Sequence, residues 1–590
     1  MVSRSNKPAI QLNKWLPICE WIKAYSRSDF GSDCFAGVIT AILLVPQGIA
    51  YAMLAGLPAQ VGLYASILPP LMYVLTGTSR TMSVGPVSIA AIMIAAALSA
   101  PHVVSHGEPL VNAMVLAAET GLILLLMALF KMGTLVTFIS HPVLTGFTSG
   151  AALLIITSQL SPLLGIDKLQ CGMEWSCYMS ALQEINSYAP LIGIGSIIFL
   201  WLFDKPLSKL LTRFAFKPVW ITAISKSGPL LMVLGGVLFA TFFISEQQTV
   251  RTVGEIPAGL PKITLVAFGA DTWSILLPSA AFIALIAYVE SVAIAKVTAQ
   301  MRRQRIDPNQ ELIALSAANL AASISGGMPV AGGFSRTMVN FSAGAVSQIA
   351  TLVAAVLLAI AVSFFTDLFA NILKTSLAAI ILVAIYPLVK FRSIMHIWQY
   401  DRADAIAEIS TLIGVLVIGI EAGLGLGIAI TLLGYLWRTS QPHIAIVGKM
   451  PNAEHFRNIE RHPVETWQGL LLIRVDENLT FANAGFIEDY IHQALANRHD
   501  IQDVALIFTS VSYIDSTALE MLENLIDSLH KNSITLHLTE VKGPVMDRLQ
   551  QTNFIKKLSP GQVFFTTHQA TTILKPQDKT EASVQAEVSS

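Results

Sequence analysis

Charged residues are scarce in this chain of 590 residues. Asp, Glu, Lys and Arg make up only 13% of it, whereas a soluble globular domain carries about 25%. Hydrophobic residues account for 54% of the chain, and the mean hydropathy is +0.62. Most of the chain is therefore too apolar to face water, and the composition predicts a membrane protein.

A surplus of either charge is also lacking, because the net charge is -1. Bulk charge therefore gives no argument for a nucleic-acid partner, and we predict none. The four cysteines are Cys19, Cys34, Cys171 and Cys177. No Cys/His spacing is typical of a metal site, so we predict neither a metal nor a cofactor. Cys171 and Cys177 share one polar loop, where a disulfide and two free thiols are both compatible with the sequence.

Long apolar segments are what the chain has in abundance. A membrane-spanning helix needs about 20 apolar residues, and glycine and proline interrupt several of the segments. We count fourteen segments, the first of which we expect Pro46 to break: 33–56, 62–77, 87–100, 112–130, 135–164, 188–203, 220–244, 275–296, 311–325, 323–341, 345–365, 368–389, 403–420 and 423–437. The loops at 205–217 and 296–305 are rich in Lys and Arg. The positive-inside rule then places both termini in the cytoplasm, for a protein of the plasma membrane or of a Gram-negative inner membrane.

The stretch 323–341, SISGGMPVAGGFSRTMVNF, is the most unusual of these segments. Its glycines and Pro329 interrupt any helix, and Ser335, Arg336 and Thr337 then begin a new one. A cation buried at membrane depth is expensive and normally faces a cavity with a function. Because a helix N-terminus adds about half a positive charge and free N–H groups, this pattern predicts an anion site.

A second interrupted stretch, Ser83-Val84-Gly85-Pro86, precedes a short apolar segment in the first half. If each half has seven segments, the two interruptions fall in the third and tenth segments, and the second half is inverted. Interrupted segments at corresponding positions are the best sequence indication of a binding site at the membrane midplane. We therefore expect the two half-helices to direct their N-termini at one site.

After residue 438 the composition changes, and strands alternate with helices, as in a small α/β domain. We expect strands at 469–475, 504–508 and 534–538, and helices at 482–496, 517–530 and 545–552. The predicted organisation is a cytoplasmic N-terminal segment at 1–32, a transmembrane domain at 33–437, a linker at 438–462, the α/β domain at 463–568 and a disordered tail at 569–590.

Several of these stretches resemble the sulfate permease (SulP) family of anion transporters. They are 46–80 (PQGIAYAMLAGLPAQVGLYASILPPLMYVLTGTSR), 83–91 (SVGPVSIAA), 141–165 (HPVLTGFTSGAALLIITSQLSPLLG) and FSRTMVN at 334–340. The C-terminal domain resembles a STAS domain, with IDSTALEML at 514–522. The resemblance implies two inverted seven-helix repeats forming uracil-permease-like core and gate domains, alternating access, a homodimer and a cytoplasmic STAS domain that a regulator could bind.

Candidate site residues come from three segments. Gln47 and Tyr51 lie four residues apart, on one helix face, and match positions that line the anion pocket of the family. Alternatively, Gln47 satisfies the backbone broken at Pro46. From the two interruptions we add Gly85, Pro86 and Val87, then Ser335, Arg336 and Thr337, with Ser83 and Ser88 as weaker candidates. Arg336 has the alternative role of holding the core together through an acid or through carbonyl groups.

Glu290 lies near the middle of the apolar segment IALIAYVESVAIAK. An acid at that depth is functional by default, and burial disfavours its charged form. A charged Glu290 would oppose an anion nearby and a protonated one would not, so we predict proton coupling. In the family, an acid at this position accompanies proton- or cation-coupled uptake. The alternative is an ion pair with Arg336 or hydrogen bonds within the bundle.

Other polar residues receive more ordinary interpretations. We expect Glu119 to be a hydrogen-bonded polar residue and His141 to belong to a helix kink. Ser516 and Thr517 occupy the position at which soluble STAS relatives are phosphorylated. Helix capping by Ser516 is the favoured alternative.

The leading functional prediction is secondary active, proton-coupled uptake of sulfate, a small inorganic anion. Two helix ends of about +0.5 each and Arg336 would balance a divalent anion. The alternatives are bicarbonate or dicarboxylate transport, by symport or exchange, an anion channel, and a sensor that signals through the C-terminal domain. We predict no enzyme, because no nucleophile–base or metal constellation is present.

Overall fold

The structure is a computed structural model that divides into two compact units, Met1–Ala429 and Ile430–Ser590. It describes residues 16–104, 107–134, 140–166, 188–214, 220–221, 224–225, 227–243, 251–264, 270–451, 453–496, 498, 500–575 and 579–582. Cys171 and Cys177, and with them the question of their disulfide, lie outside the described residues.

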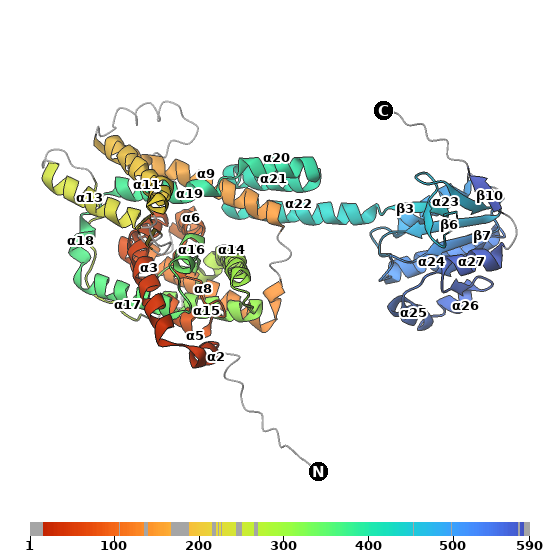
Figure 1. Ribbon diagram of the computed structural model, residues 1–590, viewed down its shortest axis with the longest axis horizontal. Coiled ribbons are helices and arrows are strands. Elements are labelled where there is room, and N and C mark those ends of the chain that lie inside the picture. Colours follow the sequence, from red (N-terminus) through yellow and green to blue (C-terminus); the bar gives the residue numbers. More distant parts are fainter. Residues whose placement is uncertain are drawn as a thin grey trace, which may run out of the picture. The chain divides into compact units, whose positions relative to one another are not determined.

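The first unit is helical (Figure 1). Its main helices are α3 (Arg27–Leu54), α4 (Ala59–Tyr64), α5 (Leu68–Thr76), α6 (Ser88–Ser99), α8 (Pro109–Leu129), α9 (His141–Leu164), α11 (Tyr188–Arg213), α13 (Gly228–Phe243), α14 (Ala270–Met301), α15 (Pro308–Ile324), α16 (Phe334–Ser342), α17 (Ile349–Phe364), α19 (Lys374–Ile385), α20 (Phe391–Tyr400), α21 (Arg402–Val417) and the first half of α22 (Ile420–Ser440). Within the described part, eight helical segments are long and apolar enough to cross a membrane, and three shorter apolar helices accompany them.

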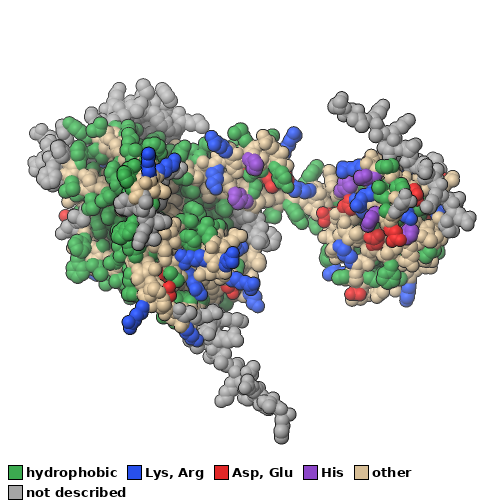
Figure 2. Space-filling model, in the orientation of Figure 1, with side chains coloured by type: hydrophobic (Ala, Val, Ile, Leu, Met, Phe, Trp, Pro, Cys, Tyr) green, Lys and Arg blue, Asp and Glu red, His purple; other side chains and the backbone are tan. Residues whose placement is uncertain are grey.

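Apolar side chains cover much of the visible surface of this unit, as Figure 2 shows. Leu191 and Trp201 of α11 and Val417 of α21 are examples of large side chains that remain exposed. In water such a surface would be a liability, whereas a lipid bilayer covers it at no cost. The surface therefore agrees with the membrane class predicted from composition.

The helices of this unit pack in two groups. In one group α15 packs on α8 and α5, α14 on α8, and α17 and α16 on α3. In the other group α9 packs on α21 and α19, and α19 on α11. Small residues allow the close approaches, since a Cβ at Gly146 of α9 would clash with the Glu408 carbonyl oxygen of α21. Such small-residue contacts are the usual means of packing helices within a membrane.

Two short strands join the interrupted segments of the first and second halves. β1 (Val84–Gly85) precedes α6, β2 (Ala331–Gly332) precedes α16, and the strands pair antiparallel. Val84 lies opposite Gly332, and Gly85 lies opposite Ala331. The prediction that the two interruptions meet is therefore confirmed.

Some predicted details differ from the structure. The expected break at Pro46 is wrong, because α3 runs through this proline as one helix. Neighbouring helices in a membrane protein can compensate for the hydrogen bond that a proline lacks. The amphipathic helix α20 was not predicted as a separate element, because it follows directly on the apolar segment of α19. The total of fourteen segments stays a prediction, since several of them extend beyond the described residues.

The second unit is an α/β domain with an eight-stranded sheet of order β10-β5-β3-β6-β7-β8-β9 and β4 beside β3. The strands are β3 (Ile444–Lys449), β4 (Phe456–Asn458), β5 (Val464–Trp467), β6 (Leu470–Val475), β7 (Asp503–Ile507), β8 (Thr535–Thr539), β9 (Val563–Phe564) and β10 (Lys579–Ala582). The helices are α23 (Ala484–Ala496), α24 (Ser516–Lys531), α25 (Gly543–Gln550), α26 (Phe554–Leu558) and α27 (Thr567–Leu574). The three predicted strands and three predicted helices correspond to β6, β7, β8, α23, α24 and α25.

The predicted linker and tail are more ordered than expected. β3 and β4 lie within 438–462. Most of α27 and all of β10 lie within 569–590, whose residues 576–578 and 583–590 are outside the described part. β3 pairs antiparallel with β6, from Ile444 opposite Val475 to Ile446 opposite Ile473. The hydrogen bonds that make 444–449 a strand thus come from a distant segment, which the local sequence pattern does not reveal.

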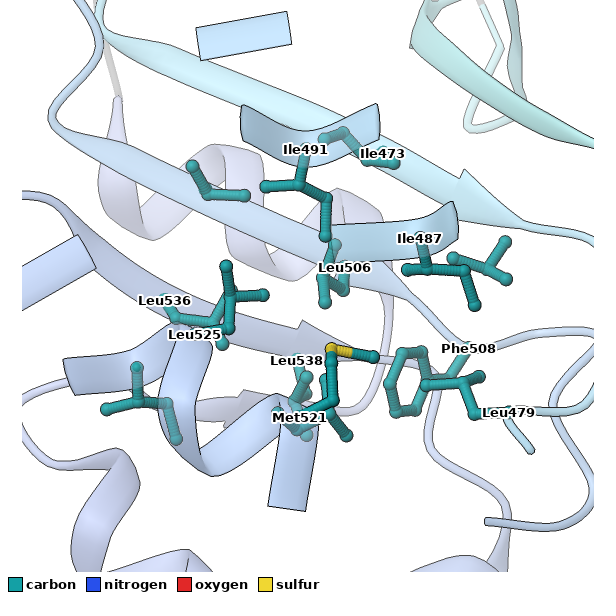
Figure 3. Packing of buried hydrophobic residues seen from close by; sticks show 14 of the residues in the cluster. Ile473, Leu479, Ile487, Ile491, Leu506, Phe508, Met521, Leu525, Leu536 and Leu538 are labelled. Carbon is teal, nitrogen blue, oxygen red and sulfur yellow. The ribbon is translucent and has the colours of Figure 1, made fainter. Parts of the chain in front are cut away.

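The core of the second unit lies between the parallel strands and the helices that cover them. Figure 3 shows strand residues such as Ile473 and Leu506 packed against Ile487 and Ile491 of α23, with Met521 of α24 close to Leu538 and Leu525 of α24 close to Leu536. Its surface carries mixed charges (Figure 2). This is the pattern of a water-facing domain, in contrast to the first unit.

Candidate functional site

The two half-helices begin directly after the paired strands. Ala91 N–H donates to Val87 O at 2.9 Å, and Thr337 N–H donates to Gly333 O at 2.9 Å, so each first turn closes at once. The backbone N–H groups that come before these first hydrogen bonds have no partner within their helix, and they form the N-terminal ends of α6 and α16. Because β1 pairs with β2, the two helix N-termini come together and their partial positive charges add.

Hydrogen bonds hold the two strands to each other and to their neighbours. Gly333 N–H donates to Ser83 O at 3.0 Å, and Ser83 N–H donates to Thr337 Oγ1 at 3.1 Å. Gly332 N–H donates to Ser291 Oγ of α14 at 2.8 Å. Thr337 is fully buried. Its hydroxyl therefore accepts a bond from the backbone of the first half, and this position departs from the predicted role in binding substrate.

Three amide side chains fix the loops on either side of the strands. Asn319 contacts the backbone of Val330 twice, with Nδ2 donating to its carbonyl at 3.0 Å and Oδ1 accepting from its N–H at 2.9 Å. Asn340 Nδ2 donates to Thr81 O at 3.0 Å. Gln348 Nε2 donates to Ser79 O at 2.6 Å and to Met82 O at 2.9 Å. Sequence reasoning missed these positioning residues, although polar side chains within apolar segments were a signal for them.

Glu311 is a further buried acid that sequence reasoning missed. Its carboxylate accepts from Tyr73 Oη at 2.7 Å and from Ser79 N–H at 3.1 Å. It also accepts from the backbone N–H of Thr78 at 2.8 Å and from the hydroxyl of Thr78. A buried carboxylate that accepts this many hydrogen bonds is satisfied without a ligand. Glu311 therefore fixes the start of the loop that leads to β1.

Arg336 lies beside Gly85, Pro86 and Gly333, with only 1% of its surface exposed. Its Nη1 donates to Pro86 O at 2.5 Å. Its Nη2 is 3.3 Å from the position of a Cβ at Gly85 and 2.8 Å from that of a Cβ at Gly333. Nε and Nη2 have no hydrogen-bond partner among the described residues. The guanidinium thus makes a carbonyl contact, which was one of the two predicted alternatives, and keeps its charge beside both helix N-termini.

A cavity of about 580 Å³ reaches these helix N-termini. Its lining includes Gln47 of α3, Ile89 of α6, Glu290 of α14 and Ser335 of α16. The side chain of Ser335 is exposed to the cavity, whereas Gln47 is almost completely buried. One carboxyl oxygen of Glu290, Oε2, has no hydrogen-bond partner within the described part of the chain. The structure therefore brings three predicted site residues, Gln47, Glu290 and Ser335, to one hollow.

The other predicted residues lie behind this lining. Tyr51 is buried one helical turn after Gln47 and lies close to Ser88, Arg336 and Glu290. Val87 is packed among Ala90, Ala287 and Ala331. Gly85 and Pro86 contact the Arg336 side chain instead of the cavity.

Comparison with known proteins assigns the chain to a family. Residues 30–411 match the sulfate permease family, and residues 462–570 match the STAS domain. This chain belongs to the sulfate permease family. Its relatives include "Probable sulfate transporter 4.2" from Arabidopsis thaliana, 30% identical over 96% of this chain and 85% of the relative. "Low affinity sulfate transporter 3" from Stylosanthes hamata is 30% identical over 94% of this chain and 89% of the relative.

Solved structures show the same fold. The murine Solute Carrier 26 family member A9 anion transporter, in an inward-facing state, aligns with a TM-score of 0.87 at 20% identity, covering 97% of this chain and 96% of that chain. The transmembrane domain of a cyanobacterium bicarbonate transporter, BicA, aligns with a TM-score of 0.57 at 21% identity, covering 68% of this chain and 98% of that chain. This sulfate permease family member is therefore a multi-pass membrane protein with a C-terminal STAS domain, and its relatives are transporters, not enzymes.

The STAS domain places Ser516 and Thr517 at the start of α24, with both side chains exposed. The predicted capping by Ser516 is wrong. Asp515 caps the helix instead, because its Oδ1 accepts from Ala518 N–H at 2.9 Å while Oδ2 accepts from Phe481 N–H at 2.6 Å. The hydroxyls of Ser516 and Thr517 are thus not needed for the cap, and a regulatory site at these residues stays a prediction.

Two polar residues of this sulfate permease family member differ from their ordinary interpretation. Glu119 was expected to be hydrogen-bonded, but both of its buried carboxyl oxygens lack a partner among the described residues. His141 was assigned to a helix kink, but it is the first residue of α9 and lines the cavity.

Proposed function

We propose that this protein is a secondary active transporter that takes up sulfate together with protons. The anion is held between the N-termini of α6 and α16, in the third and tenth transmembrane segments, and alternating access exposes it to either side. The observation that carries this proposal is the cavity that reaches both helix N-termini, with Ser335 exposed to it. Relatives that are named sulfate transporters support the choice of anion.

The binding step follows from fixed partial charges. Each helix end contributes about +0.5 and Arg336 about +1, which together match a divalent anion. Ser335 and Gln47 offer hydrogen bonds from the cavity wall, while Gly85, Pro86 and Val87 shape the backbone behind it. Tyr51 and Thr337 support the site from within the core. Because the hydrogen bonds described above hold the donors in place, the protein reorganises little when the anion arrives.

Proton coupling rests on Glu290. Its position on the cavity wall lets a proton reach it, and a charged carboxylate there repels an anion. A proton that binds Glu290 removes this repulsion, so anion and proton enter together. When the site faces the cytoplasm, release of the proton restores the repulsion and favours release of the anion.

The remaining features follow the family. We propose a homodimer in the plasma membrane, or in the inner membrane of a Gram-negative bacterium, with both termini in the cytoplasm. Residues 33–437 carry transport and 463–568 form the STAS domain, where a cytoplasmic regulator could act near Ser516 and Thr517. No nucleic acid takes part.

Uptake into proteoliposomes tests the proposal. Radiolabelled sulfate, bicarbonate and succinate are compared with and without an inward proton gradient, and we expect sulfate uptake that the gradient accelerates. Preference for bicarbonate or succinate would instead support the alternative substrates. Ion flux that does not saturate with anion concentration would support a channel.

Two variants test the assigned roles. Glu290→Gln should abolish acceleration by the proton gradient while sulfate–sulfate exchange continues, because the amide neither carries charge nor releases a proton. Normal gradient-driven accumulation in this variant would make Glu290 structural. Ser335→Ala should raise the KM for sulfate about fivefold or more, the value of one lost hydrogen bond of about 1 kcal/mol. Thr571→Ala, in the STAS domain, serves as a matched hydroxyl-deletion control with unchanged KM.

A further inference from the structure

Two basic side chains, His141 and Lys390, line the same cavity as Ser335 and Glu290. They come from the other group of helices, because His141 begins α9 and Lys390 lies between α19 and α20. Both are exposed residues. The cavity lining therefore includes a cation from elements other than the half-helices, a feature that anion binding at α6 and α16 does not require.

The His141 ring is oriented by its own helix. Its Nδ1 is 3.3 Å from Thr145 Oγ1, one turn further along α9. The Thr145 hydroxyl donates its proton to the His141 carbonyl at 3.0 Å, so it accepts from Nδ1–H. In the imidazolium form, Nε2–H is a second donor, which is available to an anion in the cavity.

The backbone at Lys390 is fixed to the same helix. Ser149 Oγ of α9 donates to Leu388 O at 3.2 Å and accepts from Lys390 N–H at 3.2 Å. These two bonds tie the segment before α20 to α9, so His141 and Lys390 share one support. The long Lys390 side chain can then follow an anion within the cavity while its Cα stays in place.

The charges near Lys390 must be weighed against this role. Glu408 of α21 is buried, lies close to Lys390 and contacts Ser393. One of its carboxyl oxygens, Oε2, has no hydrogen-bond partner among the described residues. Lys390 could therefore serve only to neutralise Glu408. Besides Glu408, the other acid to consider is Glu290, which lies on the cavity wall formed by α14.

We propose that His141 and Lys390 form a second binding site for the transported oxyanion, on the wall contributed by α9 and the start of α20. This inference rests on the proposed transport function and deepens it. The anion is first attracted to His141 and Lys390 and then passes to Ser335 and the helix N-termini. A path with two sites of moderate affinity lets an anion enter an apolar cavity and also leave it, as conduction pathways generally require.

Transport kinetics give the first test. Lys390→Gln and His141→Gln should each raise the KM for sulfate about two- to fivefold, the effect of losing one partly solvated charge contact of up to about 1 kcal/mol. The maximal rate should change less than twofold. The matched control is Arg392→Gln, which removes the same charge two residues away, from a side chain that is not part of the cavity lining. An unchanged KM in Lys390→Gln, or an equal rise in Arg392→Gln, would overturn the proposal.

The double variant Lys390→Gln/Glu408→Gln separates anion binding from charge neutralisation. If Lys390 binds the anion, the double variant keeps the raised KM. If Lys390 only neutralises Glu408, the double variant regains the KM of the unaltered protein, and the proposal fails.

A second measurement does not depend on transport. Ser335→Cys is placed in a chain whose four cysteines are replaced, and its thiol is modified by an anionic and by a neutral methanethiosulfonate. Lys390→Gln should lower the anionic-to-neutral rate ratio severalfold, Arg392→Gln should not, and sulfate should slow the anionic reagent. If no anion is taken up but this ratio falls, the proposed function fails while the second site stands. An unchanged ratio overturns the second site, whatever the transport result.

Discussion

Gly333→Ala tests whether the position of the Arg336 guanidinium sets the affinity for the anion. Gly333 has φ −91° and ψ 122°, a conformation that alanine adopts without strain. The added methyl group, however, would lie 2.8 Å from Nη2 and 3.0 Å from Nε of Arg336. The substitution therefore acts through one neighbour and leaves the backbone geometry acceptable.

The magnitude follows from the loss of one contact. The guanidinium must move by about 0.6 Å to reach the 3.4 Å at which ordinary van der Waals contact begins. Arg336 is 1% exposed, so this movement is confined and weakens the bond from Nη1 to Pro86 O. A hydrogen bond to a charged group is worth about 1.5–3 kcal/mol. If the free energy of anion binding becomes less favourable by this amount, the KM for sulfate rises about 10- to 150-fold.

The assay is sulfate uptake by proteoliposomes at a fixed proton gradient. Gly195→Ala in α11 is the matched control, because nothing lies within 4 Å of the position of its Cβ. We expect Gly195→Ala to transport like the unaltered protein and Gly333→Ala to need far more sulfate. If Gly333→Ala has the KM of the control while Arg336→Ala abolishes binding, the charge of Arg336 matters but its position does not, and the geometric argument is refuted.

Three further substitutions probe the framework of the site and the STAS domain. Thr337→Val should lower the melting temperature of the detergent-solubilised protein, because the buried Ser83 N–H loses its acceptor at a cost of about 1–3 kcal/mol, whereas Thr337→Ser should not. Glu311→Gln should destabilise by a similar amount, because an amide cannot accept all the bonds that the carboxylate accepts; a melting temperature equal to that of the unaltered protein would contradict this. In the STAS domain, burial alone would raise the pKa of Asp476, but hydrogen bonds from Arg474 and His443 outweigh it and hold the pKa below its usual value. That stabilisation is present above the unfolded pKa of about 3.9 and is lost as the pH falls through the lower folded pKa. Asp476→Asn should therefore lower the free energy of unfolding of the 430–590 fragment, measured by urea denaturation at pH 7, by about 1 kcal/mol. The difference should shrink below pH 4, and a difference that does not change with pH would count against this ion pair.

The membrane class and the meeting of the two interrupted segments followed from local patterns. Apolar segments, interrupted by glycine and proline in corresponding parts of the two halves, were enough to predict that β1 and β2 would meet. Strand and helix periodicity likewise located β6, β7, β8 and the three helices between and after them. These features depend on neighbouring residues, so the linear sequence contains them.

The roles of individual side chains were harder to predict. Ser335 and Thr337 are two residues apart on α16. Ser335 is exposed to the cavity, whereas Thr337 is buried and accepts a hydrogen bond from Ser83 N–H. Helical periodicity separates two such faces but does not say which one meets a partner from the first half. His141 and Lys390 are far apart in the sequence, and only the packing of α9 against its neighbours brings them to one cavity.

The sequence by itself determined that this is a membrane protein of the sulfate permease family with two interrupted segments, one of which carries a buried cation. It did so because burial in lipid limits charge so strongly that each polar interruption of an apolar segment carries information. Only the tertiary structure decided that Arg336 contacts the Pro86 carbonyl group of the first half, that Thr337 supports the backbone of that half, and that two further basic residues, His141 and Lys390, line the cavity. Those contacts join residues from separate parts of the chain, so they depend on how the helices pack and not on any local pattern.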